Sequence, residues 1–580
     1  MLISKYSVFL VFLTISSLLA ADLLQNSDFE HPHNIAPWVC KDCQASVVNT
    51  SYHGHRSLKV TNRHRIQSGL TQFFKVQGGK NLKCRAYIKL LNLPHGKMSV
   101  SVKMMSAIST NGRLHHSVIG LNKYVQPQYG WTEIGGDILI PAGTSRIQIS
   151  TQVDNPSVNY LLDYSSCQYI EHDPNWKTKA NQRINNLRKG SLNISLAISQ
   201  PSSTNGLTVQ IKQIKSKFAF GTAIKAPYIT DSTYKAYQDF VYNNFEWAVT
   251  ENALKWRLME WTKNHINYAK GVDAVKVLKA HGMKVRGHNM FWGTTGHSPS
   301  WLDGMSSTEL LQQMHTRVNG MISHTNGLLE HWNVNNENLH GDYFEQKTGH
   351  LNITIEMFNW IHSLEPSVKL FLNDFGVVNS NLYTTAYKSQ GRKFKDSGVP
   401  IYGIGVQSHF KTSHLDMDVL KYRLDKIAEN GFPMWITELS ILDSNAVNKA
   451  TALDDVMTLY FSHPAVEGVL LWGFWDGAVF DKTIALATGN NVTPNAAGTK
   501  WIELFHQRFR TDESHTFDGS TSIHTRVFLG EHQLVIKQNG NIIHTETINL
   551  DHGGKTATVH LQGSGLYRNN LSKSCMINCY

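Results

Sequence analysis

Two glutamates, Glu337 and Glu438, each stand at the end of a short apolar segment in the second half of the chain. A pair of carboxylates can cleave a glycosidic bond, because one protonates the leaving oxygen while the other attacks the anomeric carbon and forms a covalent intermediate. The motifs of two other hydrolase classes, the G-x-S-x-G nucleophile elbow and the H-E-x-x-H zinc site, do not occur in the sequence. The residue types therefore favour glycoside hydrolysis that uses no metal and no cofactor.

Eight short apolar segments of this kind follow one another between residues 218 and 510, each typical of a buried strand. They are 218–224, 245–250, 285–292, 331–337, 369–375, 402–409, 434–440 and 469–475. Helical periodicity separates them, for example at 267–281 and at 415–430. Alternating β-α units predict an α/β fold, a (β/α)8 TIM barrel, as the domain at 218–510. The alternative is an open doubly wound sheet, but no G-x-G-x-x-G loop follows a strand.

In such a barrel the carboxyl ends of the strands face one shared pocket. Seven of the eight predicted strands end in polar, carboxylate or aromatic residues. Any one of these residues alone could be a helix cap or a packing residue. A rim that served only stability would not need so many buried polar groups, since each costs free energy if it stays unpaired. Tryptophan rings stack on sugar faces and polar side chains bond sugar hydroxyls, so the rim predicts a carbohydrate site.

Six ordered motifs within residues 186–510 resemble glycoside hydrolase family 10, the xylanase family. They are HWNVNNE at 331–337, WITEL at 435–439, ENALKW at 251–256, RGHNMFW at 286–292, GVQSH at 405–409 and Trp472-Gly473. The resemblance implies that Glu337 is the general acid/base and Glu438 the nucleophile of a retaining endo-1,4-β-xylanase. It also implies that Glu251, Asn252, Lys255, His288, Trp292, Asn336, Gln407, His409 and Trp472 bind the substrate. The detailed pattern is closer to plant and animal members than to typical bacterial ones.

Three positions depart from the family pattern. Gly293 replaces a common histidine, and Phe480 replaces a tryptophan. These two changes leave open an alternative, a broader β-1,4-glucanase that also accepts cellulose-like chains. Ser440 replaces an aspartate that would reach the imidazole of His409, and Asp374 is another candidate for that contact. A catalytically inactive lectin is disfavoured because both glutamates of the pair are present.

Residues 22–170 predict an all-β sandwich, because short alternating runs are punctuated by glycine and proline turns. Their sequence resembles xylan-binding modules of carbohydrate-binding family 22. Trp38, Tyr87 and Trp131 are its aromatic candidates, each either a core residue or a ligand platform. We expect a linker and a β-hairpin at 171–217. A short β-rich segment is predicted at 511–580, with a hairpin turn at Asn539-Gly540.

The N-terminal segment, the cysteines and the glycosylation acceptors predict a secreted, extracellular protein, and the family resemblance implies a polysaccharide partner. Residues 1–21 resemble a signal peptide, and no other segment is apolar enough to span a membrane. The net charge is +11, but lysines and arginines are scattered, so no nucleic-acid partner is expected. We also expect no membrane partner and a monomer. Disulfides of undetermined pairing are expected among Cys40, Cys43, Cys84, Cys167, Cys575 and Cys579, and glycosylation acceptors are Asn49, Asn193, Asn352, Asn491 and Asn570.

Overall fold

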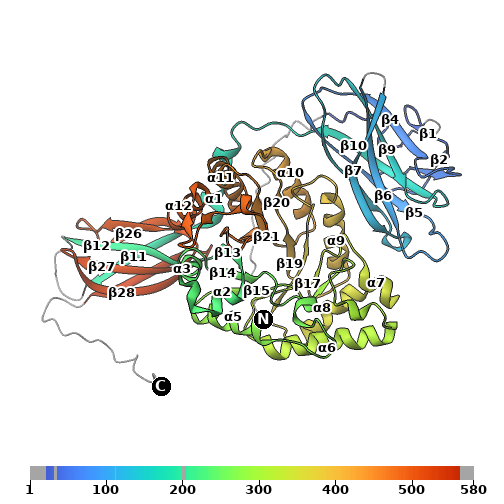
Figure 1. Ribbon diagram of the computed structural model, residues 1–580. Coiled ribbons are helices and arrows are strands. Elements are labelled where there is room, and N and C mark those ends of the chain that lie inside the picture. The colour runs from blue at the N-terminus through green and yellow to red at the C-terminus, as the bar shows by residue number, and fades with distance from the viewer. Residues whose placement is uncertain (1–20, 32–34, 111–112, 199–203, 205, 562–580) are drawn as a thin grey trace, which may run out of the picture.

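The computed structural model describes residues 21–31, 35–110, 113–198, 204 and 206–561 of the chain. Residues 1–20 of the predicted signal peptide lie outside this range, as do Asn570, Cys575 and Cys579. Figure 1 shows a central body of strands and helices with two β-rich bodies beside it, one at the blue end of the chain and one at the red end. No helix within the described ranges is long and apolar enough to cross a membrane.

The central body is a closed parallel barrel, as predicted, with eight strand positions. They are β13 (Ala219–Ile224), β14 (Trp247–Thr250), β15 (Lys284–Gly287) continued by β16 (Phe291–Trp292), β17 (His331–Asn336), β18 (Lys369–Asp374), β19 (Gly403–Val406) continued by β20 (His409–Phe410), β21 (Met434–Ile441) and β22 (Val466–Leu471). The pairing of β13 with β22 closes the ring. Every residue of β13, β17 and β21 is buried. Strands covered on both faces are near-continuous apolar runs, so they can be recognised in the sequence.

Helices surround this ring and bury one side of each strand. They are α2 (Ala226–Thr230), α3 (Lys235–Asn244), α4 (Trp256–Met259), α5 (Ala269–Ala280), α6 (Ser307–Thr325), α7 (Tyr343–Thr348), α8 (Ile353–Leu364), α9 (Thr384–Asp396), α10 (Met417–Ala428), α11 (Ala446–Ser462) and α12 (Ala496–Glu503). Along β13, Phe220 and Ile224 belong to the large core that includes the helices, whereas Ala219 and Ala223 belong to a smaller inner cluster. A capping box between Ser306 and Glu309 begins α6.

The N-terminal body is a sandwich of two antiparallel sheets, ordered β1-β4-β9-β6-β7 and β2-β3-β10-β5-β8. The strands are β1 (Val39–Lys41), β2 (Gln44–Val48), β3 (Ser57–Thr61), β4 (Gly69–Lys75), β5 (Asn81–Leu90), β6 (Val100–Thr110), β7 (Arg113–Val125), β8 (Thr132–Leu139), β9 (Arg146–Val153) and β10 (Tyr160–Tyr169). Disulfides join Cys84 to Cys167 and Cys40 to Cys43. Trp38 is buried against Phe29, which makes it a core residue.

The segment after the sandwich differs from its prediction. The expected linker contains helix α1 (Trp176–Arg188), and the two strands expected to form the hairpin pair, within the described ranges, with strands from the C-terminal part of the chain. The remaining strands are β11 (Lys189–Ile198), β12 (Leu207–Ser216), β23 (Ala487–Thr488), β24 (Thr493–Pro494), β25 (Asp512–Thr516), β26 (Ser522–Phe528), β27 (Gly530–Gln538), β28 (Asn541–Leu550) and β29 (Lys555–Leu561). Strand β11 lies between β26 and β29, whereas β12 lies between β25 and β27.

Strands β11 and β12, which precede the barrel, and strands β25 to β29, which follow it, therefore form one further β body. It encloses a separate apolar core. Strands β11 and β12 each have one apolar face, and the strands after residue 511 supply both their neighbours and the opposite side of that core. Burying apolar faces this way stabilises strands that a lone hairpin could not. The predicted turn at Asn539-Gly540 does join β27 to β28, and both residues have positive φ, 50° and 86°.

Candidate active site

Glu337 directly follows β17 and turns there into the next loop, with φ at 59°, a conformation that non-glycine residues rarely adopt. The indole Nε1 of Trp292 donates to its Oε2 at 2.8 Å, and Nε2 of Gln407 donates to its Oε1 at 3.3 Å. Burial raises the pKa of Glu337 to about 7, and the nearby carboxylates of Asp374 and Glu438 act in the same direction. The carboxyl group of Glu337 is therefore able to hold a proton near neutral pH.

Glu438 lies within β21 and is 5% exposed. Burial disfavours its charge, but hydrogen bonds to the carboxylate outweigh that effect and hold its pKa below the ordinary 4.5. Nε2 of His409 lies 3.1 Å from its Oε2, and Nδ2 of Asn373 donates to its Oε1 at 2.8 Å. A carboxylate that stays ionised in a buried site can act as a nucleophile.

The second nitrogen of His409 meets Ser440, since Nδ1 lies 2.8 Å from the serine Oγ. The alternative partner, Asp374, does not serve His409. Its Oδ1 instead lies 2.5 Å from Nδ1 of His340, and its Oδ2 accepts from the backbone N–H of Leu339 at 2.7 Å. Asp374 therefore fixes the loop that follows Glu337, and His409 has a neutral hydroxyl as its partner at Nδ1.

The side chains that follow β14 form a chain of polar contacts toward this pair. Lys255 donates to Oδ1 of Asn252 at 2.9 Å, and Nδ2 of Asn252 lies 3.2 Å from Oε1 of Glu251. The ammonium of Lys255 also lies over two indole rings, 4.8 Å from the centroid of Trp292 and 5.9 Å from that of Trp472. These contacts bring the predicted polar and aromatic residues to one end of the barrel.

His288 and Asn336 complete the group on the adjacent strands. The Oδ1 of Asn336 accepts from Asn333 and Asn373 at 2.8 and 2.9 Å, so its NH2 group is turned away from both. Nδ1 of His288 lies 3.1 Å from Nδ2 of Asn333, and its ring meets Trp472 edge-on at 5.3 Å. Burial lowers the pKa of His288 to about 3, so its imidazole is neutral and can only hydrogen-bond.

All eleven residues predicted for the site are thus connected by direct contacts or by one shared neighbour. Two residues that the sequence did not single out join them. Asn373 bridges Asn336 and Glu438, and its Oδ1 accepts from Thr437 at 2.5 Å. Lys225 follows β13 and pairs with Glu251 at 2.7 Å. The polar end of the fifth strand was a signal for Asn373, whereas Lys225 stands in no recognisable motif.

The structure explains one departure from the family pattern. A Cβ on Gly293 would lie 2.9 Å from the carbonyl oxygen of Gly341 and 3.0 Å from Cα of Asn338, so no side chain fits without a backbone shift. Phe480, by contrast, is 61% exposed, and its ring stands edge-on to His409 at 6.3 Å. Across the described part of the chain, no three or more His, Cys, Asp or Glu side chains are grouped so that they could hold a metal ion.

Comparison with known proteins identifies the domains. The sequence model of glycosyl hydrolase family 10 matches residues 210–500, and that of a carbohydrate binding domain matches residues 21–157. The anti-sigma-I factor RsgI6 of Acetivibrio thermocellus is 32% identical over 385 residues, which are 66% of this chain and 49% of the relative. Endo-1,4-beta-xylanase 1 of Arabidopsis thaliana is 28% identical over 439 residues, 75% of this chain and 45% of the relative.

The chain thus spans about half the length of these curated relatives, 49% and 45%. Among solved structures, the CBM22-1–GH10 modules of Clostridium thermocellum xylanase 10B, complexed with xylohexaose, are 17% identical with a TM-score of 0.45. That match covers 86% of this chain and 99% of the other. Because the family model spans the barrel and both buried glutamates, the chain belongs to glycosyl hydrolase family 10.

Proposed function

We propose that the chain is a retaining endo-1,4-β-xylanase, in which Glu337 is the general acid/base and Glu438 the nucleophile. The observation that carries the proposal is that the surroundings shift the pKa values of the two carboxyl groups in opposite directions. Burial raises the pKa of Glu337 to about 7, whereas hydrogen bonds hold the pKa of Glu438 below 4.5 despite its burial. Environments that push two carboxyl groups apart in pKa define an acid and a nucleophile.

In the first step the Glu438 carboxylate attacks the anomeric carbon, and the bond to the leaving sugar breaks. The Glu337 carboxyl group donates its proton to the departing oxygen, so a covalent glycosyl-enzyme and a shortened chain result. Asn373 and His409, both bonded to Glu438, hold its two oxygens in a fixed orientation. Nε1 of Trp292 orients Glu337 in the same way.

In the second step Glu337, now ionised, takes a proton from water, and the resulting hydroxide attacks the same anomeric carbon. The ester bond to Glu438 breaks, and its carboxylate is regenerated. Two inversions give net retention of configuration. The NH2 group of Asn336 is oriented by its bonds to Asn333 and Asn373 and is available to a sugar hydroxyl throughout the cycle.

Substrate choice is tested by the release of reducing ends from xylan and from carboxymethyl cellulose. Xylan is the proposed substrate, because the family match and the named plant relatives, the endo-1,4-beta-xylanases of Arabidopsis thaliana, support it. The alternative, a broader β-1,4-glucanase, is favoured by the exposed Phe480 beside His409, where a smaller ring leaves more room than tryptophan. Comparable rates on both polymers would establish the alternative. No release of reducing ends from either polymer would exclude both activities.

We also propose that the protein is secreted and carries a signal peptide at 1–21. The disulfide Cys84–Cys167 joins neighbouring strands β5 and β10, and disulfides persist in oxidising compartments. Mass spectrometry of protein from the culture medium of a eukaryotic host should find a mature chain that begins near residue 22. Retention of the protein inside the cells with its first residues intact would contradict this.

A further inference from the structure

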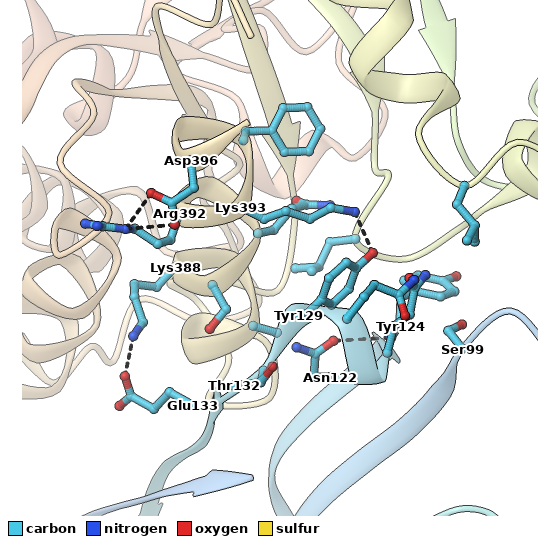
Figure 2. A pocket seen from close by; sticks show the side chains of 18 of the residues that line it. Ser99, Asn122, Tyr124, Tyr129, Thr132, Glu133, Lys388, Arg392, Lys393 and Asp396 are labelled. Atoms are coloured by element: carbon cyan, nitrogen blue, oxygen red, sulfur yellow. Dashed lines mark hydrogen bonds and ion pairs between the residues drawn. The ribbon is translucent and has the colours of Figure 1, made fainter. Parts of the chain in front are cut away.

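The sandwich docks on the barrel beside α9, where strands β7 and β8 face that helix (Figure 1). Lys388 of α9 contacts Glu133 of β8 at this junction (Figure 2). Two barrel loops also meet the sandwich here, residues 337–342 after β17 and residues 375–383 after β18. The first of these loops begins with Glu337, so the sandwich contacts a segment that belongs to the active site.

Lys123, near the end of β7, contacts both loops. Its Nζ donates to the carbonyl oxygen of His340 at 3.2 Å and lies 5.7 Å from the ring centroid of Tyr383. Two residues earlier on the strand, the backbone N–H of Leu121 donates to the carbonyl oxygen of Leu382 at 2.8 Å. A hydrogen bond from an ammonium group is roughly twice as strong as one between neutral groups. Strand β7 therefore holds both loops, and Lys123 supplies the charged contact.

His340 connects this contact to the proposed acid/base. Its backbone N–H donates to the carbonyl oxygen of Glu337 at 3.0 Å. Its Nδ1 lies 2.5 Å from Oδ1 of Asp374, whose Oδ2 accepts from the backbone N–H of Leu339 at 2.7 Å. The side chains of His340 and Asp374 are 8% and 2% exposed, so solvent does not replace these contacts. The loop after Glu337 is thus held by Asp374 from the barrel and by Lys123 from the sandwich.

Glu337 depends on this loop because its own backbone conformation is unusual. Its φ is 59°, and a non-glycine residue stays in that region only where the surrounding structure fixes it. The position of Asp374 also matters, since its charge is one of the causes that raise the pKa of Glu337. A looser loop would therefore misplace the proton donor and move that charge. Glu438 is bonded to Asn373 and His409 instead, so the nucleophile should keep its geometry.

We infer that Lys123 is a positioning residue for the general acid/base: through the carbonyl group of His340, the sandwich holds Glu337 where it can transfer its proton. The inference rests on the proposed function, because it assigns this contact to the step that Glu337 catalyses. It gives the sandwich a part in the reaction that differs from binding polysaccharide. Removal of the Lys123 ammonium group should then impair proton transfer more than attack by the nucleophile.

Two aryl xylobiosides that differ only in the leaving group separate proton transfer from nucleophilic attack. Dinitrophenolate leaves without protonation, whereas phenolate needs a proton from the acid. In Lys123→Met, kcat/KM for the phenyl glycoside should fall about tenfold, and kcat/KM for the dinitrophenyl glycoside should stay within about twofold of the parent value. Glu337→Ala should give the same pattern with a larger loss, on the order of 10²-fold or more. The ratio of the two kcat/KM values does not depend on the fraction of a variant that is folded.

Two further variants separate the donated hydrogen bond from a general disturbance of the junction. Lys123→Arg keeps a charged donor and should restore the ratio to within about twofold of the parent value. Asn81→Ala is the matched control, because Nδ2 of Asn81 donates to Oδ2 of Asp416 at 2.7 Å, at the start of α10. It removes a sandwich-to-barrel hydrogen bond from a different part of the junction and should leave the ratio unchanged.

An unchanged ratio in Lys123→Met would overturn the inference, and so would a ratio that changes equally in Asn81→Ala. A changed ratio that Lys123→Arg fails to restore would assign the effect to something other than the donated hydrogen bond and would overturn the inference too. A parent protein that hydrolyses neither glycoside would contradict the proposed function and the inference with it. An active parent with any of the preceding results contradicts only the inference.

Discussion

Two buried glutamates, one in the active site and one at the junction with the sandwich, meet opposite surroundings. Glu337 has hydrogen-bond donors but no cation in contact with its carboxyl group among the described residues, and burial raises its pKa to about 7. Glu133 is 3% exposed and is contacted by the ammonium groups of Lys388 and Lys426. Burial opposes the charge of Glu133 as well, but the two lysines outweigh it and lower its pKa.

Glu337 is therefore suited to exchange a proton, whereas Glu133 holds the sandwich and the barrel together. A carboxyl group with a pKa near the working pH can donate and accept a proton, which general acid/base catalysis requires. A carboxylate between two lysines stays charged, and its loss would leave those buried lysines with the half-exposed Glu429, which lies 2.9 Å from Lys426 and 3.8 Å from Lys388. Nearby, Arg423 contacts Asp137 at 2.7 Å and reinforces the same junction. We therefore expect changes at the active site to impair turnover, and changes at the junction to impair stability.

The largest effect is expected from Glu438→Ala. Turnover of xylan should fall on the order of 10⁵-fold, because the nucleophile is removed, while thermal stability should change little. Azide should partly restore the rate and give a glycosyl azide of inverted configuration, since a small anion can occupy the vacated space. The measurement is steady-state kinetics with an activated aryl xyloside, with and without azide. A variant that keeps more than a tenth of the activity would show that Glu438 is not the nucleophile.

The opposite pattern is expected from Glu133→Gln. The free energy of unfolding should drop by about 3 kcal/mol, because two buried lysines lose their charged partner, while kcat on a short soluble substrate should stay within about twofold. Glu429→Gln is the matched control: Glu429 also contacts Lys426 but is 49% exposed, so its loss should cost about 1 kcal/mol or less. Denaturant unfolding at pH 7 measures both. Equal losses of unfolding free energy in the two variants would show that the buried Glu133 stabilises the fold no more than the half-exposed Glu429.

The effect of Glu133→Gln on the free energy of unfolding should depend on pH. Because the pKa of Glu133 in the folded protein lies below its ordinary 4.5, its pairs stabilise the fold above that value. The stabilisation is lost as the pH falls through the lowered pKa. The difference in unfolding free energy between Glu133→Gln and the parent should therefore shrink below pH 4. A difference that grows on acidification would contradict the assigned charge state.

The active-site carboxyl groups should set the pH profile of kcat/KM. Glu337 must be protonated to act as an acid, so activity should decline as the pH rises through about 7. Glu438 must be ionised, and its lowered pKa places the acid limb below 4.5. In Trp292→Phe the N–H donor that favours the ionised form of Glu337 is lost, so the alkaline limb should move to higher pH. An unmoved alkaline limb would assign it to a group other than Glu337.

The smallest effect is expected from Ser440→Asp. A carboxylate placed beside Nδ1 of His409 favours the charged imidazolium, and that charge should lower the pKa of Glu438 further. The acid limb of kcat/KM should then move to lower pH, with little change at the alkaline limb. Ser440→Ala serves as the control that removes the hydrogen bond without adding charge. If the aspartate and the alanine variants give the same profile, His409 does not relay charge to the nucleophile.

The barrel could be predicted, and the candidate site residues could be expected at one end of it, because their signals are local. Buried parallel strands are continuous apolar runs, and the polar residues at their ends lie within recognisable motifs. The junction had no such signal, since Glu133 and Lys388 are 255 residues apart and each is an ordinary surface residue type. The predicted hairpin of β11 and β12 is wrong for the same reason. The two strands are neighbours in sequence, but their partners begin after residue 511. Lys225 likewise meets Glu251 because the two residues follow the paired strands β13 and β14.

Proton NMR of the first products released from a xylo-oligosaccharide shows whether the anomeric configuration is retained. If Glu438 attacks the anomeric carbon and Glu337 then activates water, two inversions occur and the new reducing end is initially the β-anomer. The α-anomer should rise only later, by mutarotation. Initial appearance of the α-anomer would mean a single displacement by water, and the roles assigned to the two glutamates would then be wrong.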